Sequence, residues 1–577
     1  MKILGIKLTH DAAFALVDNG KLIFSYELEK LNNNVRHIDF NIDLRDIEPV
    51  LRQYGYEMEE LDKIVIDGWS ADGWQLDGTN AYVDLPFFRK MPVHGTDRLV
   101  RLTHYGYLLK GKEALRPEIL KLEDEDIEYS SYPHISGHIF SSYCTSPFAI
   151  PGEPSYVLVW DGSIVPQLFY FDKGEITTKG ILFPLVGQSL VFFSRQFPPY
   201  DNCGLLDISI AGKIMAYIAL GSPQEDLLTA WQDELTLLME RHREEDPDVA
   251  LTFSMSRNFV EVAVAIAKTG SHSGADILCS FHYFLQMAMM QGLQKLMSLE
   301  AQGSKNLCIA GGCALNIKWN SAIRDSGMFH RVWVPPFPND AGSALGAACC
   351  EMVNQGRYCL EWNVYSGPAI NKNNMEGEWQ SLHCTLRQLA ILLHNSQEPV
   401  VFLQGKAELG PRALGNRSIL ASAANPRMKD RLNKIKNREG YRPVAPICME
   451  EYGTEVFSPG YPDPYMLFEH TVRDEWKDKT PAICHLDNTA RLQTVNAGEN
   501  LPIYELLKEY YKVSGIPLLC NTSANFNGKG FFPDLNSVAQ WGGVLFVWCE
   551  GKLYYSRKTN PEIVKEWMTF EYMSKML

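Results

Sequence analysis

The 577-residue sequence lacks any apolar run long enough to cross a bilayer, which excludes a membrane-spanning helix. Lys7, His10 and Asp11 interrupt the first apolar stretch, so neither a signal peptide nor an anchor is expected there. CxxC pairs are also absent, and the 13 cysteines are scattered through apolar segments. This distribution is typical of reduced, buried thiols in a cytoplasmic protein and argues against a disulfide framework or a zinc ribbon.

An excess of positive charge is lacking too, because the formal net charge is −15. Such a surface is a poor platform for nucleic-acid phosphates, so no nucleic-acid partner is expected. Internal sequence repeats and low-complexity tracts are absent as well. With 577 residues, of which 46% are hydrophobic, the chain is expected to form at least two globular domains.

Segments rich in β-forming residues alternate with helical stretches, which predicts an α/β protein. The opening is expected to be a hairpin, because Asp18-Asn19-Gly20 is a turn signal between β-rich segments. The expected strands are residues 2–6, 13–17, 22–26, 63–66, 156–159, 306–309 and 331–334, and the longest expected helix is 275–299.

A change in composition marks a domain boundary, because residues 367–378 are polar and rich in asparagine. Thr385 and Gln388 then have the spacing of a capping box, and apolar residues follow at helical spacing. The division expected from these features is a first domain of residues 1–365, a linker of 366–383 and a second α/β domain of 384–577.

His134 and His138 are four residues apart, which on a helix puts both imidazoles on one face, within reach of one ion. An isolated pair fits two unrelated surface histidines equally well. Two carboxylates favour the metal interpretation. Asp161 follows an expected strand, and Asp340 lies in a loop of small residues that opens a helix. Such a donor set suits Fe(II), which we expect first, or Mn(II) or Zn(II).

Glycine turns follow several expected strands. Backbone N–H groups approach a phosphate closely only where side chains are absent, so these turns suit a nucleotide-binding cleft. Each turn alone is better explained as a plain tight connection between elements. The residues expected to contact a nucleotide are Gly162, Gly311, Gly312, Asn316 and Gly342.

Taken in order, these motifs resemble the actin/hexokinase-type nucleotide fold, in the branch that includes the tRNA threonylcarbamoyl-transferase. The resemblance covers residues 1–365. It implies that His134, His138 and Asp340 bind a metal ion, with Asp161 as a fourth ligand.

His10 lies in the turn between the first two expected strands. Its position fits a solvated turn histidine. In the O-carbamoyltransferases that this chain resembles, a histidine in this turn activates the acceptor. Imidazole titrates near neutrality and suits removal of a proton from a hydroxyl, so the resemblance implies a general base here.

The most distinctive stretch is residues 404–442, which hold ten Lys or Arg and three Asp or Glu, a local charge of +7. Interleaved glycine and proline break helical faces, which argues against a plain solvated basic face. Arginine offers planar, bidentate donors for phosphates and carboxylates. An anion site is therefore expected in this region.

The order of four motifs, at residues 410–418, 436–443, 489–495 and 521–525, resembles the carbamoyltransferase family of antibiotic and nodulation-factor biosynthesis. The second domain of that family is similar to threonylcarbamoyl-AMP synthase and is called YrdC-like. The resemblance implies that the residues binding carbamoyl phosphate and ATP are Arg412, Lys436, Arg442, Arg491, Asn521 and Ser523. Arg417 stays open as an alternative to Arg412.

The implied reaction makes carbamoyl-adenylate from carbamoyl phosphate and ATP, with Mg²⁺ accompanying ATP, and passes the carbamoyl group to a hydroxyl of a small natural product. Rival interpretations are a tRNA-modifying threonylcarbamoyl transferase and a non-catalytic nucleotide-binding regulator. The acidic composition weighs against the first, and the joint presence of a metal set and an anion set weighs against the second. The acceptor's identity and a homodimeric state stay open.

Overall fold

The computed structural model describes residues 1–8, 10–33, 47–70, 90–93, 96–99, 101–102, 111–121, 128–204, 209–244, 253–300, 305–373, 375, 377–526 and 528–569. It divides the chain into two compact units. Unit 1 comprises Met1–Ser25 with His37–Asn363, and unit 2 comprises Tyr26–Arg36 with Val364–Leu577. No helix in the described part is long and apolar enough to cross a membrane.

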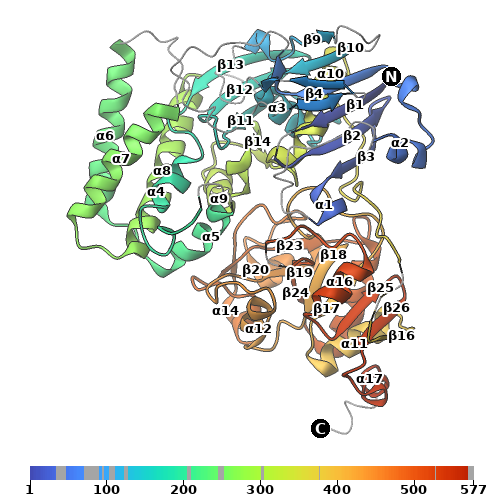
Figure 1. The fold of residues 1–577 in the computed structure, drawn as a ribbon. Helices are drawn as coiled ribbons and strands as arrows, with labels where there is room; N and C mark the ends of the chain where they lie inside the picture. Colours follow the sequence, from blue (N-terminus) through green and yellow to red (C-terminus); the bar gives the residue numbers. More distant parts are fainter. Residues whose placement is uncertain are drawn as a thin grey trace. The chain divides into compact units, whose positions relative to one another are not determined.

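Unit 1 (Figure 1) contains a six-stranded and a five-stranded sheet, and the order of the five strands recurs in the first five strands of the larger sheet. The first has the order β3-β2-β1-β4-β10-β9 and the second β13-β12-β11-β14-β15. In each sheet an antiparallel hairpin, β1–β2 or β11–β12, continues into parallel strands on its other side. The strands are β1 (Lys2–Lys7), β2 (Ala13–Asp18), β3 (Lys21–Glu27), β4 (Lys63–Asp67), β9 (Glu118–Lys121), β10 (Glu128–Tyr132), β11 (Ser155–Val159), β12 (Gln167–Asp172), β13 (Glu175–Ile181), β14 (Asn306–Ala310) and β15 (Arg331–Trp333).

The helices of unit 1 connect these strands or form a separate group. They are α2 (Glu48–Gln53), α3 (His134–Cys144), α4 (Ser189–Ser194), α5 (Ile210–Tyr217), α6 (Glu225–Glu244), α7 (Phe253–Thr269), α8 (Gly274–Ser298), α9 (Ile317–Asp325) and α10 (Ser343–Asn354). Short strands pair as β5 (Trp69–Ser70) with β8 (Arg101–Leu102), and β6 (Lys90–Val93) with β7 (Thr96–Leu99). In Figure 1 the green helices α6, α7 and α8 lie together. Aromatic side chains of the three helices contact one another. The rings of Phe193 and Phe281 stack with their centroids 3.8 Å apart, beside the buried Trp231.

The two helices α3 and α10 pack closely through glycines. A Cβ atom on Gly346 would lie 2.2 Å from the carbonyl oxygen of Gly137, so no larger residue fits without a shift. In the same way, a Cβ on Gly5 of β1 would lie 2.0 Å from the oxygen of Ala344. Small residues therefore let α10 approach both α3 and the first strand.

Unit 2 is built on a mixed eight-stranded sheet with the order β16-β26-β25-β17-β18-β24-β19-β23. Its strands are β16 (Trp379–His383), β17 (Val400–Leu403), β18 (Arg417–Ala421), β19 (Ala445–Met449), β23 (Gln493–Val495), β24 (Leu518–Ser523), β25 (Phe546–Cys549) and β26 (Lys552–Ser556). A small sheet is formed by β20 (Phe457–Ser458), β21 (His470–Val472) and β22 (Thr489–Ala490). The helices are α1 (Glu29–Asn32), α11 (Leu386–Ser396), α12 (Met428–Ile435), α13 (Gly453–Val456), α14 (Asp474–Lys477), α15 (Leu501–Ser514), α16 (Leu535–Trp541) and α17 (Pro561–Trp567).

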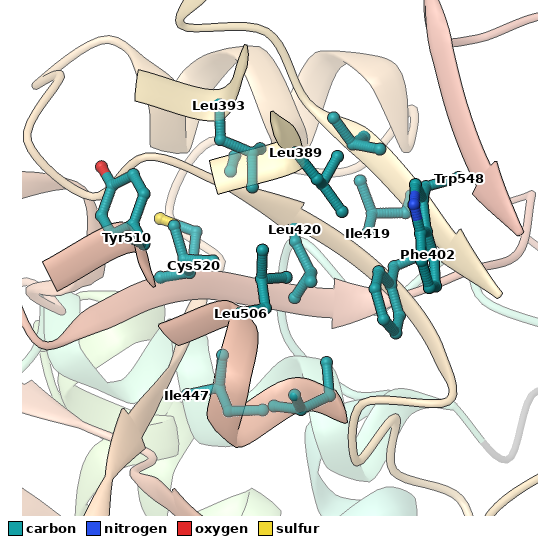
Figure 2. Close-up of a cluster of buried hydrophobic side chains, with 14 of the residues drawn as sticks. Leu389, Leu393, Phe402, Ile419, Leu420, Ile447, Leu506, Tyr510, Cys520 and Trp548 are labelled. Carbon is teal, nitrogen blue, oxygen red and sulfur yellow. The ribbon is translucent and has the colours of Figure 1, made fainter. Parts of the chain in front are cut away.

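Apolar side chains from the sheet and from α11 and α15 form one core in unit 2. Figure 2 shows Leu389 of α11 and Leu506 of α15 among the side chains that fill it. Phe402 and Trp548 of neighbouring parallel strands stack at 4.5 Å. Burial of each large apolar side chain contributes roughly 1.5–3 kcal/mol to folding.

The local predictions are largely confirmed. The opening hairpin, the later strands and the long helix are present, with ends that differ from the predicted ones by at most one residue. Thr385 and Gln388 form the capping box of α11, with both reciprocal hydrogen bonds. The segment 366–383, expected to be a linker, includes β16, which pairs with β26. The repeated strand order of unit 1 was not foreseen, because the sequence contains no matching repeat.

Candidate active site

The predicted HxxxH pair lies on the first turns of α3. Strand β10 ends at Tyr132, Pro133 is the N-cap residue, and the helix begins at His134. Both histidine side chains are buried, and the distance between Nε2 of His134 and Nε2 of His138 is 3.2 Å. The expectation that one helix face carries both imidazoles is confirmed.

Asp340 opens the short helix η8 (Asp340–Gly342), which leads into α10. Its Oδ1 lies 3.3 Å from Nε2 of His134 and 3.5 Å from Nε2 of His138. The close glycine packing of α10 on α3 brings these three side chains together. Asp161 follows β11, and its carboxylate completes a group of four ligand atoms that all lie within 4.8 Å of one another.

The arrangement fits one metal ion. Ligand atoms that each lie about 2.1 Å from one ion are separated from one another by roughly 3–3.5 Å, and the separations among His134, His138 and Asp340 fall in or near that range. Burial disfavours protonation of His134, but the carboxylates of Asp67 and Asp340 outweigh it and raise its pKa to about 9. The negative electrostatic potential of these carboxylates therefore favours a bound cation at this site.

Two residues of this site were missed by the sequence analysis. Asp67, at the end of β4, accepts a hydrogen bond from Nδ1 of His134 at 2.8 Å, which turns Nε2 toward Asp340. A carboxylate of this kind commonly orients a metal-binding histidine. The Nζ atom of Lys7 is fully buried, 2.9 Å from Asp340 and 3.4 Å from Asp67. Lys7 and Asp67 each stand at the end of a largely apolar strand, β1 and β4, and this position in the sequence could have identified them.

His10 lies next to the same carboxylate. Its Nε2 is 3.1 Å from Oδ2 of Asp340, and 36% of its side chain is exposed. One edge of the ring is thus oriented by the cluster, while the side chain stays accessible to a ligand. The predicted base and the predicted metal ligands are therefore brought together.

The predicted glycine turns lie close to Asp161. The N–H of Gly312 donates to Oδ1 of Asp161, and a Cβ on Gly311, whose φ is +89°, would lie 2.2 Å from the oxygen of Trp160. Gly162 follows Asp161 directly in the sequence. Gly342 belongs to the same η8 helix as Asp340, and a Cβ there would lie 2.3 Å from the oxygen of Phe337.

Asn316 differs from the other predicted nucleotide contacts. Its side-chain oxygen caps α9 by accepting from Lys318 and Trp319, and its Nδ2 lies 2.8 Å from Nε2 of His282. Both ends of the amide are thus engaged within the protein.

In unit 2 three arginines of the predicted anion site lie together. Burial lowers the pKa of Arg412, and the neighbouring Arg491 and Arg442 lower it further. Burial and Arg442 likewise lower the pKa of Arg491 to about 10. Like charges in a buried cluster are unfavourable unless an anion joins them. The cluster is therefore suited to bind a phosphorylated ligand.

Arg417 has a different environment. Its two terminal nitrogens donate to the carbonyl oxygens of Gln404, Asn416, Pro368 and Gly405, at 2.7–3.2 Å. These four bonds occupy most of the donors of one guanidinium. Arg417 therefore has few donors left for a ligand, whereas the choice between Arg412 and Arg417 as the phosphate ligand stays a prediction.

Lys436 and Ser523 lie in contact at the end of β24. The Nζ of Lys436 donates to the backbone oxygen of Ser523 at 2.6 Å and lies 3.3 Å from its hydroxyl oxygen, and it also contacts Asn525. Asn521 donates to Gln493 at 2.8 Å, whereas its buried Oδ1 accepts from no group among the described residues. An acceptor of this kind is available to an amide N–H of a ligand.

Sequence reasoning missed two residues of the second cluster. Arg438 is half-buried beside Arg442 and Arg491, and partial burial together with these like charges lowers its pKa to about 9. Asn525 contacts the ammonium of Lys436. Both belong to the motifs at residues 436–443 and 521–525. Arg438 follows Lys436 by two positions and Asn525 follows Ser523 by two positions, and this proximity in sequence could have identified them.

Comparison with known proteins identifies related sequences along nearly the whole chain. Residues 2–349 match the carbamoyltransferase N-terminus, and residues 391–541 match the carbamoyltransferase C-terminus. Nodulation protein U of Sinorhizobium fredii (strain NBRC 101917 / NGR234) is 44% identical over 571 residues, covering 96% of this chain and 99% of that protein. The 3'-hydroxymethylcephem-O-carbamoyltransferase of Streptomyces clavuligerus is 29% identical, covering 94% of this chain and 96% of that protein.

Solved structures align only weakly. Component A of the Acidaminococcus fermentans (R)-2-hydroxyglutaryl-CoA dehydratase has a TM-score of 0.31 and 12% identity, covering 61% of this chain and 99% of that chain. Full-length HypF in its phosphate- and nucleotide-bound form has a TM-score of 0.27 and 13% identity, covering 61% of this chain and 55% of that chain. These scores carry no argument about fold or function. The sequence matches, in contrast, span both units, and they establish that the chain belongs to the carbamoyltransferase family and is a carbamoyltransferase.

Proposed function

We propose that the chain is an ATP-dependent O-carbamoyltransferase with two separate sites. The observation that carries the proposal is the segregation of two chemical groups, a buried His, His, Asp and Asp set in unit 1 and a cluster of arginines in unit 2. We assign residues 1–365, apart from Tyr26–Arg36, to an actin/hexokinase-type transfer domain. Residues 384–577 form a YrdC-like activation domain, to which Tyr26–Arg36 and β16 of the predicted linker 366–383 also belong. The repeated strand order of unit 1 supports the first assignment.

The activation half would take place in unit 2. Carbamoyl phosphate loses its phosphate to water and leaves carbamate, whose oxygen attacks the α-phosphorus of ATP, so that pyrophosphate departs and carbamoyl-adenylate forms. Arg412, Arg442 and Arg491 would bind the phosphates. Ser523, beside the ammonium of Lys436, would hydrogen-bond the small acyl group. The free acceptor of Asn521 would take a hydrogen bond from the carbamoyl NH₂.

The transfer half would take place in unit 1. His134, His138, Asp340 and Asp161 would hold one divalent metal ion, Fe(II) first, with Mn(II) or Zn(II) as alternatives. When bound, that ion would hold the phosphate of the adenylate and stabilise the charge on departing AMP. His10 would remove the proton of the acceptor hydroxyl, which attacks the carbamoyl carbon. The N–H groups of the Gly311-Gly312 turn would lie along the nucleotide.

We infer a small hydroxylated natural product as the acceptor. The supporting facts are the names of the relatives, one a cephem O-carbamoyltransferase and another a nodulation protein, and the net charge of −15, which disfavours tRNA. ATP, with Mg²⁺, and carbamoyl phosphate would be the co-substrates.

Three variants, each assayed with carbamoyl phosphate plus ATP and with supplied carbamoyl-adenylate, test the proposal. His10→Ala should still catalyse ATP–pyrophosphate exchange dependent on carbamoyl phosphate, but should lose acceptor carbamoylation by about 10²–10⁴-fold, the usual contribution of a general base. Arg442→Ala should lose exchange about ten- to a hundredfold, as for a charge-assisted contact, yet transfer normally from supplied carbamoyl-adenylate. Lys436→Ala should behave like Arg442→Ala.

The matched control is Arg387→Ala, whose side chain is 70% exposed in unit 2 and should leave both reactions unchanged. A folded His10→Ala enzyme that also loses exchange would replace the two-site proposal with a single composite site. Carbamoylation or threonylcarbamoylation of tRNA in place of small alcohols would favour the tRNA-modifying alternative.

A further inference from the structure

A short segment from the N-terminal part of the sequence belongs to unit 2. The division between the units falls inside β3, so that Tyr26–Arg36 is grouped with Val364–Leu577. Helix α1 (Glu29–Asn32) lies within this segment. Neither the composition nor the family motifs had pointed to a contact between residues about 380 positions apart, such as Lys30 and Gly410.

Lys30 and Glu27 are joined in a buried ion pair that holds one loop of unit 2. The Nζ of Lys30 lies 2.8 Å from Oε1 of Glu27, and the two side chains are only 2% and 5% exposed. The same ammonium donates to the carbonyl oxygens of Glu408 and Gly410. The N–H of Gly410 donates back to Oε1 of Glu27 at 2.7 Å. The pair therefore binds Gly410 through both of its backbone polar groups.

A second contact anchors the segment itself. The carbonyl of Asn33 accepts from the N–H of Gly530 at 2.9 Å, and the ammonium of Lys30 lies 5.3 Å from the ring centre of Phe531. A Cβ on Gly530 would lie 2.4 Å from the oxygen of Glu29, so only glycine fits there without a shift.

The loop held in this way carries Arg412. On its far side the buried carboxylate of Glu408 accepts from the backbone N–H groups of Leu414, Asn416 and Arg417. Gly410 has a φ of +82°, a conformation that favours glycine. Arg412 thus lies between two fixed points, one set by Lys30 and Glu27 and the other by Glu408.

A buried ion pair contributes little net stability, because desolvation of both charges offsets their attraction. Its clearest effect is to fix the position of the groups that it contacts. An arginine needs such a fixed position to bind a phosphate through two parallel hydrogen bonds. We propose that Lys30, held by Glu27, is a positioning residue for the carbamoyl phosphate and ATP site, acting through Gly410 on Arg412. The inference rests on the proposed function of the arginine cluster.

The test uses the full chain. E27Q/K30M replaces the pair with neutral side chains of similar size and leaves no unpaired buried charge, while K30R keeps the charge and the reach. Each variant is assayed for ATP–pyrophosphate exchange with varied carbamoyl phosphate, for transfer from supplied carbamoyl-adenylate and for thermal melting. Lys21→Met is the control, since its exposed ammonium pairs with Glu361 at 2.7 Å in unit 1.

We expect E27Q/K30M to raise the KM for carbamoyl phosphate at least about tenfold, because small displacements of a positioned group can cost up to about a hundredfold. Transfer should stay normal, and K30R should recover part of the loss. Unchanged exchange in E27Q/K30M, alongside lost exchange in Arg412→Ala, would overturn this inference alone. A parallel loss of both reactions would overturn it too, as a sign of general misfolding. Unchanged exchange in Arg412→Ala would overturn the proposed function and this inference together.

Discussion

The Nε2 atoms of His134 and His138 lie 3.2 Å apart, and both lie within 3.5 Å of one carboxylate oxygen of Asp340. Two Nε2 atoms at this distance either form a hydrogen bond, in which one imidazole donates its N–H to the lone pair of the other, or direct both lone pairs at a metal ion. The Nδ1 of His134 is already bound to Asp67, so its free nitrogen is Nε2. The two Nε2 atoms are thus placed where they could bind one ion together with Asp340 and Asp161.

The double variant His134→Ala/His138→Ala should bind no first-row metal and should not carbamoylate an acceptor, because a single-ion site loses both of its nitrogen ligands. Metal content measured by mass spectrometry after purification checks the first part. His272→Ala is the control, since that histidine pairs with the exposed Asp226 in the same unit and should keep full occupancy. Full metal content in the double variant would contradict the assignment.

Gly346→Ala should weaken the metal site without removing any ligand. The added Cβ must move α10 away from the Gly137 backbone, and overpacking of this kind typically costs about 1–3 kcal/mol. Because Asp340 precedes α10, the shift should separate it from the histidines and lower metal affinity. Equilibrium dialysis and thermal melting measure the two effects. Gly212→Ala on α5 is the control, because a Cβ atom there would meet no atom within 4 Å. This variant should lower neither the metal affinity nor the melting temperature.

Arg412→Ala and Arg417→Ala should fail in different ways. Loss of Arg412 should lower carbamoyl phosphate-dependent exchange about ten- to a hundredfold while the protein melts normally. Loss of Arg417 leaves four carbonyl oxygens without their donor, at roughly 1–3 kcal/mol for a buried unsatisfied group, and should lower the melting temperature. The reverse pattern would make Arg417 the phosphate ligand.

His282 should make unit 1 sensitive to acid. Burial and, to a smaller extent, the nearby charge of Lys318 lower its pKa to about 3, although a hydrogen bond with Asn316 opposes the shift. Between pH 3 and the ordinary pKa near 6.5 the unfolded chain binds the extra proton, so stability falls as pH decreases, by up to about 1.4 kcal/mol per pH unit.

His282→Gln keeps an amide partner for Asn316 but cannot titrate. Its melting temperature should therefore depend less steeply on pH between 6.5 and 4 than that of the unaltered protein. Identical slopes for the two proteins would show that His282 is not a source of the acid sensitivity.

Sequence patterns predicted the strands, the long helix, the capping box at Thr385 and the histidine pair on one helix face. Each of these depends on residues within a few positions of one another, where hydrophobic periodicity and hydrogen bonding between neighbours decide the conformation. The order of the motifs also pointed to the family, and the matches along the chain confirm it.

The tertiary structure decided the rest. Lys7 and Asp67 lie beside the histidine pair because β1 and β4 pair in parallel. The environment of Arg417 differs from that of Arg412 because four backbone carbonyl oxygens accept its hydrogen bonds. The contact of Lys30 with Gly410 spans 380 residues. No local signal encodes such contacts, because they exist only once packing has brought distant segments of the chain together, and packing depends on all of those segments at once.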